Sequence, residues 1–162
     1  MTVARPPHVP PPAVTLRAAE PHDCERVWVL RNEEDVRRAS FDSTEIPWVL
    51  HERWFFESLE RGDRKIYVIV VRGRTEGVAR LDIVRGEATV SVYLAPEWRG
   101  KGVGPIALRK LGVIAFRDLK LRRLVASVKD DNHASRAAFK KAKFTETRKD
   151  RGVVNLLRLR GR

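Results

Sequence analysis

The first third of the chain has the apolar period of helices. Cys24, Val27, Trp28 and Arg31 recur at i, i+3, i+4 and i+7, which places them on one face of a helix that opens after Pro21. The other segments predicted in this part are a short strand at 14–17 and helices around 33–38 and over 47–61.

From residue 65 onward the period changes to that of strands. Segment 65–71 has the pattern of a buried strand, segments 76–83 and 88–94 that of its partners, and turns at 73–74 and 85–87 connect them. This pattern predicts an antiparallel meander. The remaining predicted elements are a glycine-rich loop at 99–104, helices at about 105–118 and 132–142, and strands at 121–128, 144–147 and 153–159. The order of elements predicts an α/β domain built on one mixed sheet.

Length and composition indicate one domain. The 162 residues are 43% apolar, which is enough for a single core. Five of the nine prolines lie in the first twelve residues, so 1–13 is expected to be a disordered tail and 14–162 a single domain. The longest apolar run, 66–71, is too short to cross a membrane, and no apolar segment of a secretion signal follows the N-terminus.

The cysteine and histidine content limits the chemistry. Cys24 is the only cysteine, which excludes an internal disulfide framework and a cysteine-based zinc site, and which fits a reducing compartment. No cluster has metal-ligand spacing, and no Ser-His-Asp order is suggested. We therefore expect a cytoplasmic protein with no metal and no acyl-enzyme intermediate.

The net charge of +12 is unevenly distributed. Residues 1–98 hold 14 basic and 16 acidic side chains, net −2, whereas residues 99–162 hold 19 and 5, net +14. A nucleic-acid-binding module would interleave such charges with exposed aromatic residues. After position 98 the aromatic residues are Phe116, Phe139 and Phe144, all at positions expected to be buried. The pattern argues against nucleic acid as a partner and for a phosphate-bearing ligand of the C-terminal half.

Three alternate glycines lie between the third strand of the meander and the next helix. Gly100, Gly102 and Gly104 leave little side-chain bulk, so backbone N–H groups and the positive end of the helix can hold a pyrophosphate. Arg99 and Lys101 add formal charge beside them. The spacing excludes two common phosphate loops, the dinucleotide G-x-G-x-x-G pattern and the P-loop.

The remaining pattern, Arg99-x-x-Gly102-x-Gly104, resembles the acyl-CoA pyrophosphate loop of the GCN5-related N-acetyltransferases (GNAT). A second stretch, 132–144, is similar to that family's Asn-x-x-Ser/Ala-x-x-x-Tyr-x-x-x-Gly-Phe element. The resemblance covers about 14–162. It implies the GNAT fold, a single mixed and mostly antiparallel sheet flanked by helices, with acetyl-CoA or coenzyme A bound where a strand, a glycine-rich loop and a helix meet.

The resemblance also implies roles for the matching residues. The strand around 92–94 would splay from its neighbour, and its free N–H groups would bind pantetheine and polarise the thioester carbonyl, with Leu94 as the catalytic position. Asn132 and Ser135 would contact the pantetheine arm and phosphates, although a helix cap and a first-turn residue are the structural alternatives. The predicted cofactor-binding residues are Val92, Tyr93, Leu94, Arg99, Gly100, Lys101, Gly102, Val103, Gly104, Asn132, Ser135 and Phe139.

Two positions depart from the family pattern. Phe139 replaces the usual tyrosine, whose hydroxyl protonates the departing thiolate, so the acid step has no obvious group. Because thiolate is a good leaving group, the expected cost is about 10²-fold. Lys143 replaces the glycine that usually ends the helix, which predicts a less strained helix terminus.

The N-terminal half resembles the amino-sugar N-acetyltransferases of pseudaminic acid biosynthesis, on segments 30–41, 51–55 and 77–82 together with Ile46. The same short elements occur in ribosomal-protein N-terminal acetyltransferases. The resemblance implies an amine on a nucleotide-linked deoxysugar as acceptor. The predicted substrate-binding residues are Arg31, Asn32, Arg37, Trp54 and Arg80, with a core position for Trp54 and a solvated helix face for Arg37 as alternatives.

A base on the acceptor side would have to accept the proton of the amine. His51 titrates near neutral pH in its unperturbed form, and Glu33 and Asp82 are carboxylate candidates, although Asp82 could instead orient Arg80.

The sequence thus predicts an acetyl-CoA-dependent N-acetyltransferase in which a small-molecule primary amine, with a nucleotide-linked amino sugar as the leading acceptor, attacks the thioester directly. The alternatives are a ribosomal-protein or peptide N-terminal acetyltransferase and a CoA-binding protein with weak catalysis. No membrane partner is expected, and a homodimer is an open alternative to a monomer.

Overall fold

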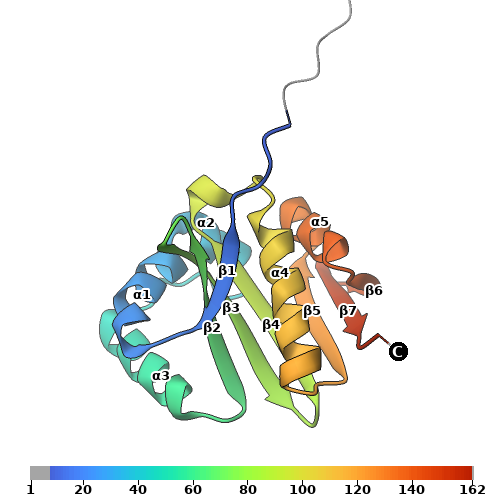
Figure 1. The fold of residues 1–162 in the computed structure, drawn as a ribbon. Helices are drawn as coiled ribbons and strands as arrows, with labels where there is room; N and C mark the ends of the chain where they lie inside the picture. Colours follow the sequence, from blue (N-terminus) through green and yellow to red (C-terminus); the bar gives the residue numbers. More distant parts are fainter. Residues whose placement is uncertain (1–7, 162) are drawn as a thin grey trace, which may run out of the picture.

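A computed structural model describes residues 8–161 and shows one seven-stranded sheet (Figure 1). The strand order is β1-β2-β3-β4-β5-β7-β6, in which β4 and β5 are the parallel pair and the other neighbours are antiparallel. The strands are β1 (Val14–Ala18), β2 (Arg64–Val71), β3 (Arg74–Val84), β4 (Glu87–Leu94), β5 (Arg123–Lys129), β6 (Thr145–Asp150) and β7 (Val153–Leu159). The helices are α1 (Cys24–Asn32), α2 (Glu34–Ala39), α3 (Trp48–Glu60), α4 (Val103–Val113) and α5 (His133–Lys141).

This architecture confirms the predicted α/β fold with a mixed, mostly antiparallel sheet. The predicted helix at 105–118 is divided, because α4 ends at Val113 and one π-helical turn continues over Ile114–Asp118. Of the predicted tail, residues 1–7 lie outside the described residues, and 8–13 form no helix or strand. Within 8–161, none of the helices combines the length and apolarity that a membrane crossing requires.

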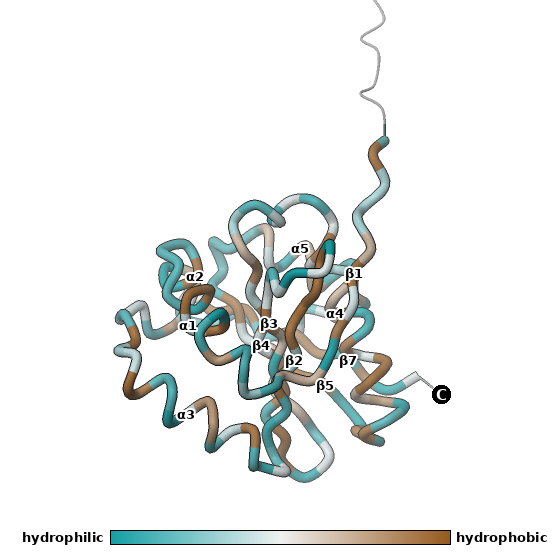
Figure 2. The backbone as a smooth tube through the Cα atoms, turned by 60° about the vertical axis from the view of Figure 1, so that its left-hand side comes forward, coloured by the Kyte–Doolittle hydropathy of each residue, from teal (hydrophilic) through white to brown (hydrophobic). Residues whose placement is uncertain are grey.

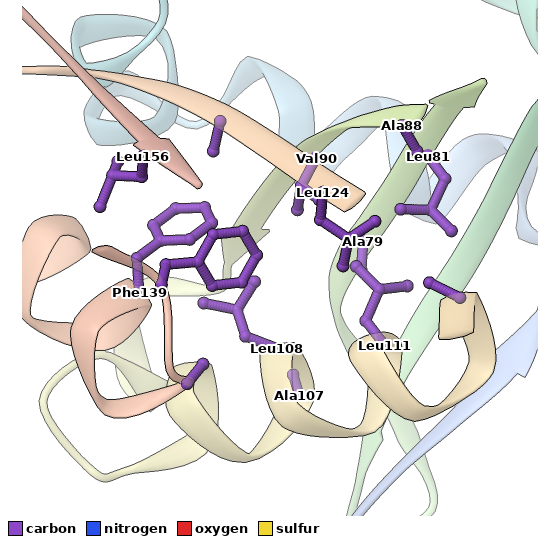
Figure 3. Close-up of a cluster of buried hydrophobic side chains, with 14 of the residues drawn as sticks. Ala79, Leu81, Ala88, Val90, Ala107, Leu108, Leu111, Leu124, Phe139 and Leu156 are labelled. Carbon is purple, nitrogen blue, oxygen red and sulfur yellow. The ribbon is translucent and has the colours of Figure 1, made fainter. Parts of the chain in front are cut away.

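Two apolar clusters lie on opposite faces of the sheet, because successive side chains of a strand point to opposite faces. The larger cluster packs α4 and α5 against the sheet, with Leu108, Leu111 and Phe139 among its members (Figure 3). The smaller cluster packs α1 and α3 against the other face through residues such as Leu30 and Phe55. The tube of α3 alternates hydrophobic and hydrophilic residues, as expected for a helix with one face on the core (Figure 2). The two faces of the sheet are therefore covered by different parts of the chain.

The end of α5 corrects the prediction of a less strained terminus at Lys143. This residue has φ of +69°, in the left-handed region that favours glycine. The backbone thus keeps the conformation for which the family uses glycine, and a lysine adopts it. The strain remains at this position because Phe144, the next residue, is buried and its N–H donates to the Phe139 carbonyl at 3.0 Å.

We expect Lys143→Gly to raise the free energy of unfolding by about 1 kcal/mol, because glycine adopts the left-handed region without a Cβ penalty. For a chain of this size the expected rise in Tm is roughly 2–4 °C. Lys143→Ala, which removes the charge but keeps the Cβ atom, is the control. Equal stabilisation by both substitutions, measured by thermal denaturation, would assign the effect to charge and contradict the backbone explanation.

Candidate active site

Strands β4 and β5 pair only over their first residues. Residues 87–89 pair with 123–125, and beyond these pairs the strands are no longer partners, although β4 continues to Leu94 and β5 to Lys129. Strands that separate leave backbone N–H and C=O groups without ladder partners. This opening, which we call the β4–β5 split, is the arrangement that the family resemblance implied for 92–94.

The N–H groups of Val92 and Leu94 point into the β4–β5 split. Ala95, directly after the strand, donates its N–H to the Glu76 carbonyl at 2.7 Å, on the β3 side. Because successive residues of an antiparallel strand direct their backbone groups to opposite sides, Leu94 and Val92 direct theirs away from β3. The Leu94 carbonyl accepts a hydrogen bond from Arg99 Nη2 at 3.2 Å, on this open side. Two backbone donors therefore line the split.

The glycine-rich loop connects β4 to α4. Gly100 and Gly102 have φ of +69° and +80°, and a Cβ atom at Gly100 would meet nothing within 4 Å. Gly102 is the N-cap of α4, and no described side chain caps this helix. The first-turn N–H groups and the positive end of α4 are therefore available to an anion. Lys101 adds charge, with Nζ 5.3 Å from the centroid of the Trp98 ring.

Helix α2 bridges the open end of the β4–β5 split. Arg99, after β4, pairs with Asp35 of α2, with Nη1 2.8 Å from Oδ2. Lys129, at the end of β5, donates from Nζ to the Arg38 carbonyl of α2 at 2.8 Å. The Arg99 guanidinium, which was predicted to meet the pyrophosphate, is thus held by Asp35 and by the Leu94 carbonyl. Asp35 and Lys129 therefore border the split, although the sequence analysis did not single them out.

The predicted residues of α5 lie in two different environments. Asn132 is the N-cap, and its side chain accepts a hydrogen bond from the Ser135 N–H at 3.1 Å. The structural alternative for Asn132, a helix cap, is therefore what the geometry shows. Phe139 is 2% exposed and packs edge-on against Phe144, with ring centroids 5.0 Å apart. It belongs to the core, and neither ring carries a group that could donate a proton.

Three predicted substrate-binding residues form hydrogen bonds to the backbone of the segment that connects α2 and α3. Asn32 donates from Nδ2 to the Ile46 carbonyl and accepts from the Ile46 N–H, both at 2.9 Å. Arg31 and Arg37 each donate one hydrogen bond to a carbonyl of this connection, at 3.3 Å. The prediction of substrate binding is thus not supported for Asn32 and Arg37. Arg31 keeps a second buried nitrogen, Nη1, without a partner among the described residues.

Asp82 lies between two arginines on the same face of the sheet. Its carboxylate accepts from Arg64 Nε at 2.6 Å and from Arg80 Nε at 2.8 Å. Both guanidinium carbons lie near the Trp54 ring, 5.5 Å and 5.7 Å from its centroid. Both carboxylate oxygens are engaged by guanidinium groups, so the structure favours the orienting role for Asp82 over the role of base. Trp54 contacts these arginines and is part of the packing around α3.

The side chain of Tyr93 faces the α1 and α3 side of the sheet, away from α4. Burial raises the pKa of its hydroxyl, and the positive charges of Arg31 and Arg80 partly offset this increase. Tyr93 was predicted to bind the cofactor, and its backbone does lie in the strand that borders the split. Its side chain lies instead among the residues predicted for the acceptor.

Glu33 lies at the junction of α1 and α2 and is half-buried. The neighbouring carboxylates of Glu34 and Asp35 pair with Arg38 and Arg99, whereas no described residue forms an ion pair with Glu33. Of the two predicted carboxylate bases, Glu33 is therefore the one that forms no ion pair with a described residue.

His51 is buried between α3 and α1. It is 2% exposed, its Nε2 lies 2.9 Å from the Cys24 carbonyl, and its ring stacks on Phe55. Hydrogen bonding to a carbonyl makes Nε2 the N–H donor. Burial lowers the pKa of the imidazole, against the opposing effect of this hydrogen bond. The structure therefore gives His51 a packing role and does not support the prediction of a base.

A buried neutral histidine makes stability depend on pH. With a folded-state pKa below the unfolded value, His51 binds a proton more readily in the unfolded chain, so the free energy of unfolding falls as the pH drops below about 6.5. We expect His51→Gln to reduce this dependence of Tm on pH and to change kcat only a few-fold. A loss of kcat of about 100-fold without a change in the pH dependence of Tm would restore the role of base.

Residues 13–145 match the acetyltransferase (GNAT) domain family, and the chain belongs to it. It is an acetyl-CoA-dependent N-acetyltransferase, which confirms the predicted class of enzyme and the predicted cofactor. The chain is 27% identical to YdaF of Bacillus subtilis (strain 168), for which a ribosomal N-acetyltransferase activity is proposed, over 85% of this chain and 81% of that protein. It is 37% identical to an N-acetyltransferase 9-like protein of Caenorhabditis elegans, over 37% of this chain and 29% of that protein.

Solved structures share the fold at low sequence identity. A spermidine N-acetyltransferase of Vibrio cholerae, in complex with CoA and spermine, superposes with a TM-score of 0.83 at 19% identity, over 91% of this chain and 95% of that chain. The aminoglycoside acetyltransferase AAC(6')-Ib, in complex with coenzyme A and kanamycin, superposes with a TM-score of 0.80 at 17% identity, over 91% of this chain and 95% of that chain. These relatives do not support the amino-sugar branch that the sequence resemblance suggested.

Proposed function

We propose that the amine acceptor binds on the face of the sheet that carries α1, α2 and α3, and attacks acetyl-CoA held on the α4 side of the β4–β5 split. The observation that carries this proposal is the separation of β4 from β5 after residues 89 and 125, with a glycine-rich helix start at one rim. The split connects the two faces at one point, so an amine from one face can meet a thioester from the other.

The residues along the split suit the cofactor. The backbone of Gly100–Gly104 and the start of α4 would hold the pyrophosphate, Lys101 would add charge, and Ser135 would lie beside the arm. Val92 and Leu94 would donate their N–H groups to the pantetheine arm and to the carbonyl oxygen of the acetyl group. When bound, acetyl-CoA supplies an acetyl group already activated as a thioester.

Glu33 is the group that we propose to accept the amine proton, directly or through a water molecule. This role follows from its place at the α1–α2 junction and from its unengaged carboxylate, in contrast to Asp82 and His51. The departing thiolate takes its proton from the ammonium product or from water, since Phe139 supplies no hydroxyl. The expected cost of the missing acid is about 10²-fold in turnover.

The acceptor class that we propose is a small primary amine, and a nucleotide-linked amino sugar is one member of that class. The intraprotein contacts of Asn32, Arg37 and Trp54 reduce the support for a nucleotide site. The similarity to YdaF favours a second candidate, the N-terminal amine of a protein.

The test measures cofactor binding and turnover separately. We expect saturating acetyl-CoA to raise Tm by several degrees. Thiol release from acetyl-CoA is then followed with nucleotide-linked amino sugars, simple amino sugars, polyamines and peptides that begin with a free amine. An unchanged Tm, or no thiol release with any amine above the rate of hydrolysis, would contradict the proposed function.

A further inference from the structure

The acceptor face contains a buried arginine nitrogen that has no partner among the described residues. Arg31 lies in the last turn of α1, and its Nη2 donates to the Asp42 carbonyl at 3.3 Å. Its Nη1 is buried without a hydrogen bond. A buried guanidinium N–H without an acceptor is costly, so such a group is usually paired with an anion or a carbonyl. Arg31 therefore presents a donor that a ligand could satisfy.

Arg80 supplies a second positive group on the same face. Its Nε pairs with Asp82, and its Nη2 lies 3.4 Å from the Ser91 hydroxyl oxygen. The same Asp82 carboxylate also pairs with Arg64. One carboxylate thus pairs with two guanidinium groups, so Arg64, Arg80 and Asp82 together carry one net positive charge.

Both arginines lie on the face of the sheet to which the Tyr93 side chain points. Arg80 of β3 faces Ser91 of β4 in the strand register, and Tyr93 follows two residues later on the same face. Helix α1, which carries Arg31 in its last turn, packs against β3 and β4 on this face, and the positive charges of both arginines oppose the rise in the pKa of the Tyr93 hydroxyl. Tyr93 precedes Leu94, whose N–H points into the split. The cluster of Arg31, Arg80 and Tyr93 therefore lies next to the point where transfer is proposed to occur.

From this arrangement, and resting on the proposed function, we infer that the natural acceptor carries a carboxylate or phosphate group that binds Arg31 and Arg80 while its amine reaches the β4–β5 split. A guanidinium fork binds carboxylate and phosphate oxygens in a planar, bidentate geometry. Of the carboxylates near the cluster, Asp82 and Asp35 are held by arginines, whereas Glu33 and Asp42 form no ion pair with a described residue.

The test compares acceptors that differ in one anionic group. Glucosamine and glucosamine 6-phosphate form one pair, and a dipeptide with a C-terminal carboxylate and its C-terminal amide form the other, so the two arms distinguish phosphate from carboxylate. With the unaltered enzyme we expect kcat/KM, measured by thiol release, to be about 10- to 100-fold higher for the anionic member of at least one pair. Spermidine and kanamycin, which carry no anionic group, are expected to be poorer than the anionic members.

Two variants connect this preference to the arginines. Arg31→Met and Arg80→Met should remove the preference, so that the ratio of kcat/KM between the anionic and the neutral member falls to about one, while the KM for acetyl-CoA changes only a few-fold. Among the hydrogen bonds of the described residues, Arg31→Met loses one, the 3.3 Å contact of Nη2 with the Asp42 carbonyl, so it is expected to fold. Arg53→Met, at an exposed position of α3, is the matched control and should keep the preference.

The outcomes separate the inference from the function on which it rests. Acetylation of neutral or cationic amines at equal or higher kcat/KM would overturn the inference and leave the proposed transfer intact. A preference for the anion that persists in both arginine variants would also overturn it, because another site would then bind the anion. No thiol release with any amine would instead contradict the proposed function.

Discussion

Leu94→Pro is expected to lower kcat by roughly 100- to 1000-fold while acetyl-CoA still binds. Proline removes the N–H that we propose to donate to the carbonyl oxygen of the acetyl group, and the loss of one such donor has an effect of this size. The N–H of Leu94 points away from β3, so the substitution removes no ladder hydrogen bond from that side. Steady-state kinetics measures kcat, and the shift of Tm with acetyl-CoA measures binding.

Leu94→Ala is the control for this prediction. It shortens a side chain that lies against Gly77 and Gly104, where Cβ atoms would be 2.7 Å and 3.7 Å from its methyl carbons, but it keeps the N–H. We expect kcat of Leu94→Ala to stay within a few-fold of the unaltered enzyme. Similar losses in both variants would show that side-chain packing, and not the backbone donor, accounts for the effect.

Glu33→Gln is expected to lower kcat/KM about 100-fold near pH 7, because the amide cannot accept the proton of the amine. The deficit should shrink as the pH rises, since a growing fraction of the acceptor is then already a neutral amine. A pH profile of kcat/KM from pH 6 to 10 measures both effects. A structural role alone would give a deficit that is constant across the profile.

Glu34→Gln is the matched control, since Glu34 is the next residue along the chain and its carboxylate pairs with Arg38 on an exposed helix face. We expect its kcat/KM to stay within about two-fold. If Glu34→Gln and Glu33→Gln lower kcat/KM equally, the general negative potential of this region, and not one carboxylate, supports the reaction.

The strands and the cofactor loop could be predicted from the sequence because their signals are local. Alternation over 76–83 and 88–94 depends on neighbouring residues, and Gly100 and Gly102 mark a backbone that only glycine adopts easily. The contacts that position α2 could not be predicted in this way. Arg99 and Asp35 are 64 residues apart, and Lys129 and Arg38 are 91 apart, so only the folded chain brings them together.

His51 shows that a local signal can also be misread. It shares one face of α3 with Trp48, Phe55 and Ser58, at offsets of three, four and seven residues, which is the pattern of a helix face on a core. The chemistry of histidine suggested a base, but the position within the helix indicated burial. For Arg31, Asn32 and Arg37, residue type alone could not distinguish a substrate ligand from a donor to a backbone carbonyl.

The short junction between β4 and β5 also bears on how the molecule unfolds. Three residue pairs join the sheet of β1–β4 to that of β5–β7, so the two parts can exchange amide hydrogens as separate cooperative units before the whole chain opens. Residues 123–159 of the second unit carry ten basic and four acidic side chains, net +6, so like charges repel each other there. Acetyl-CoA bound across the junction would neutralise part of this charge through its phosphates and would contact both units. The cofactor would then act as a non-covalent cross-link that makes the two units unfold together.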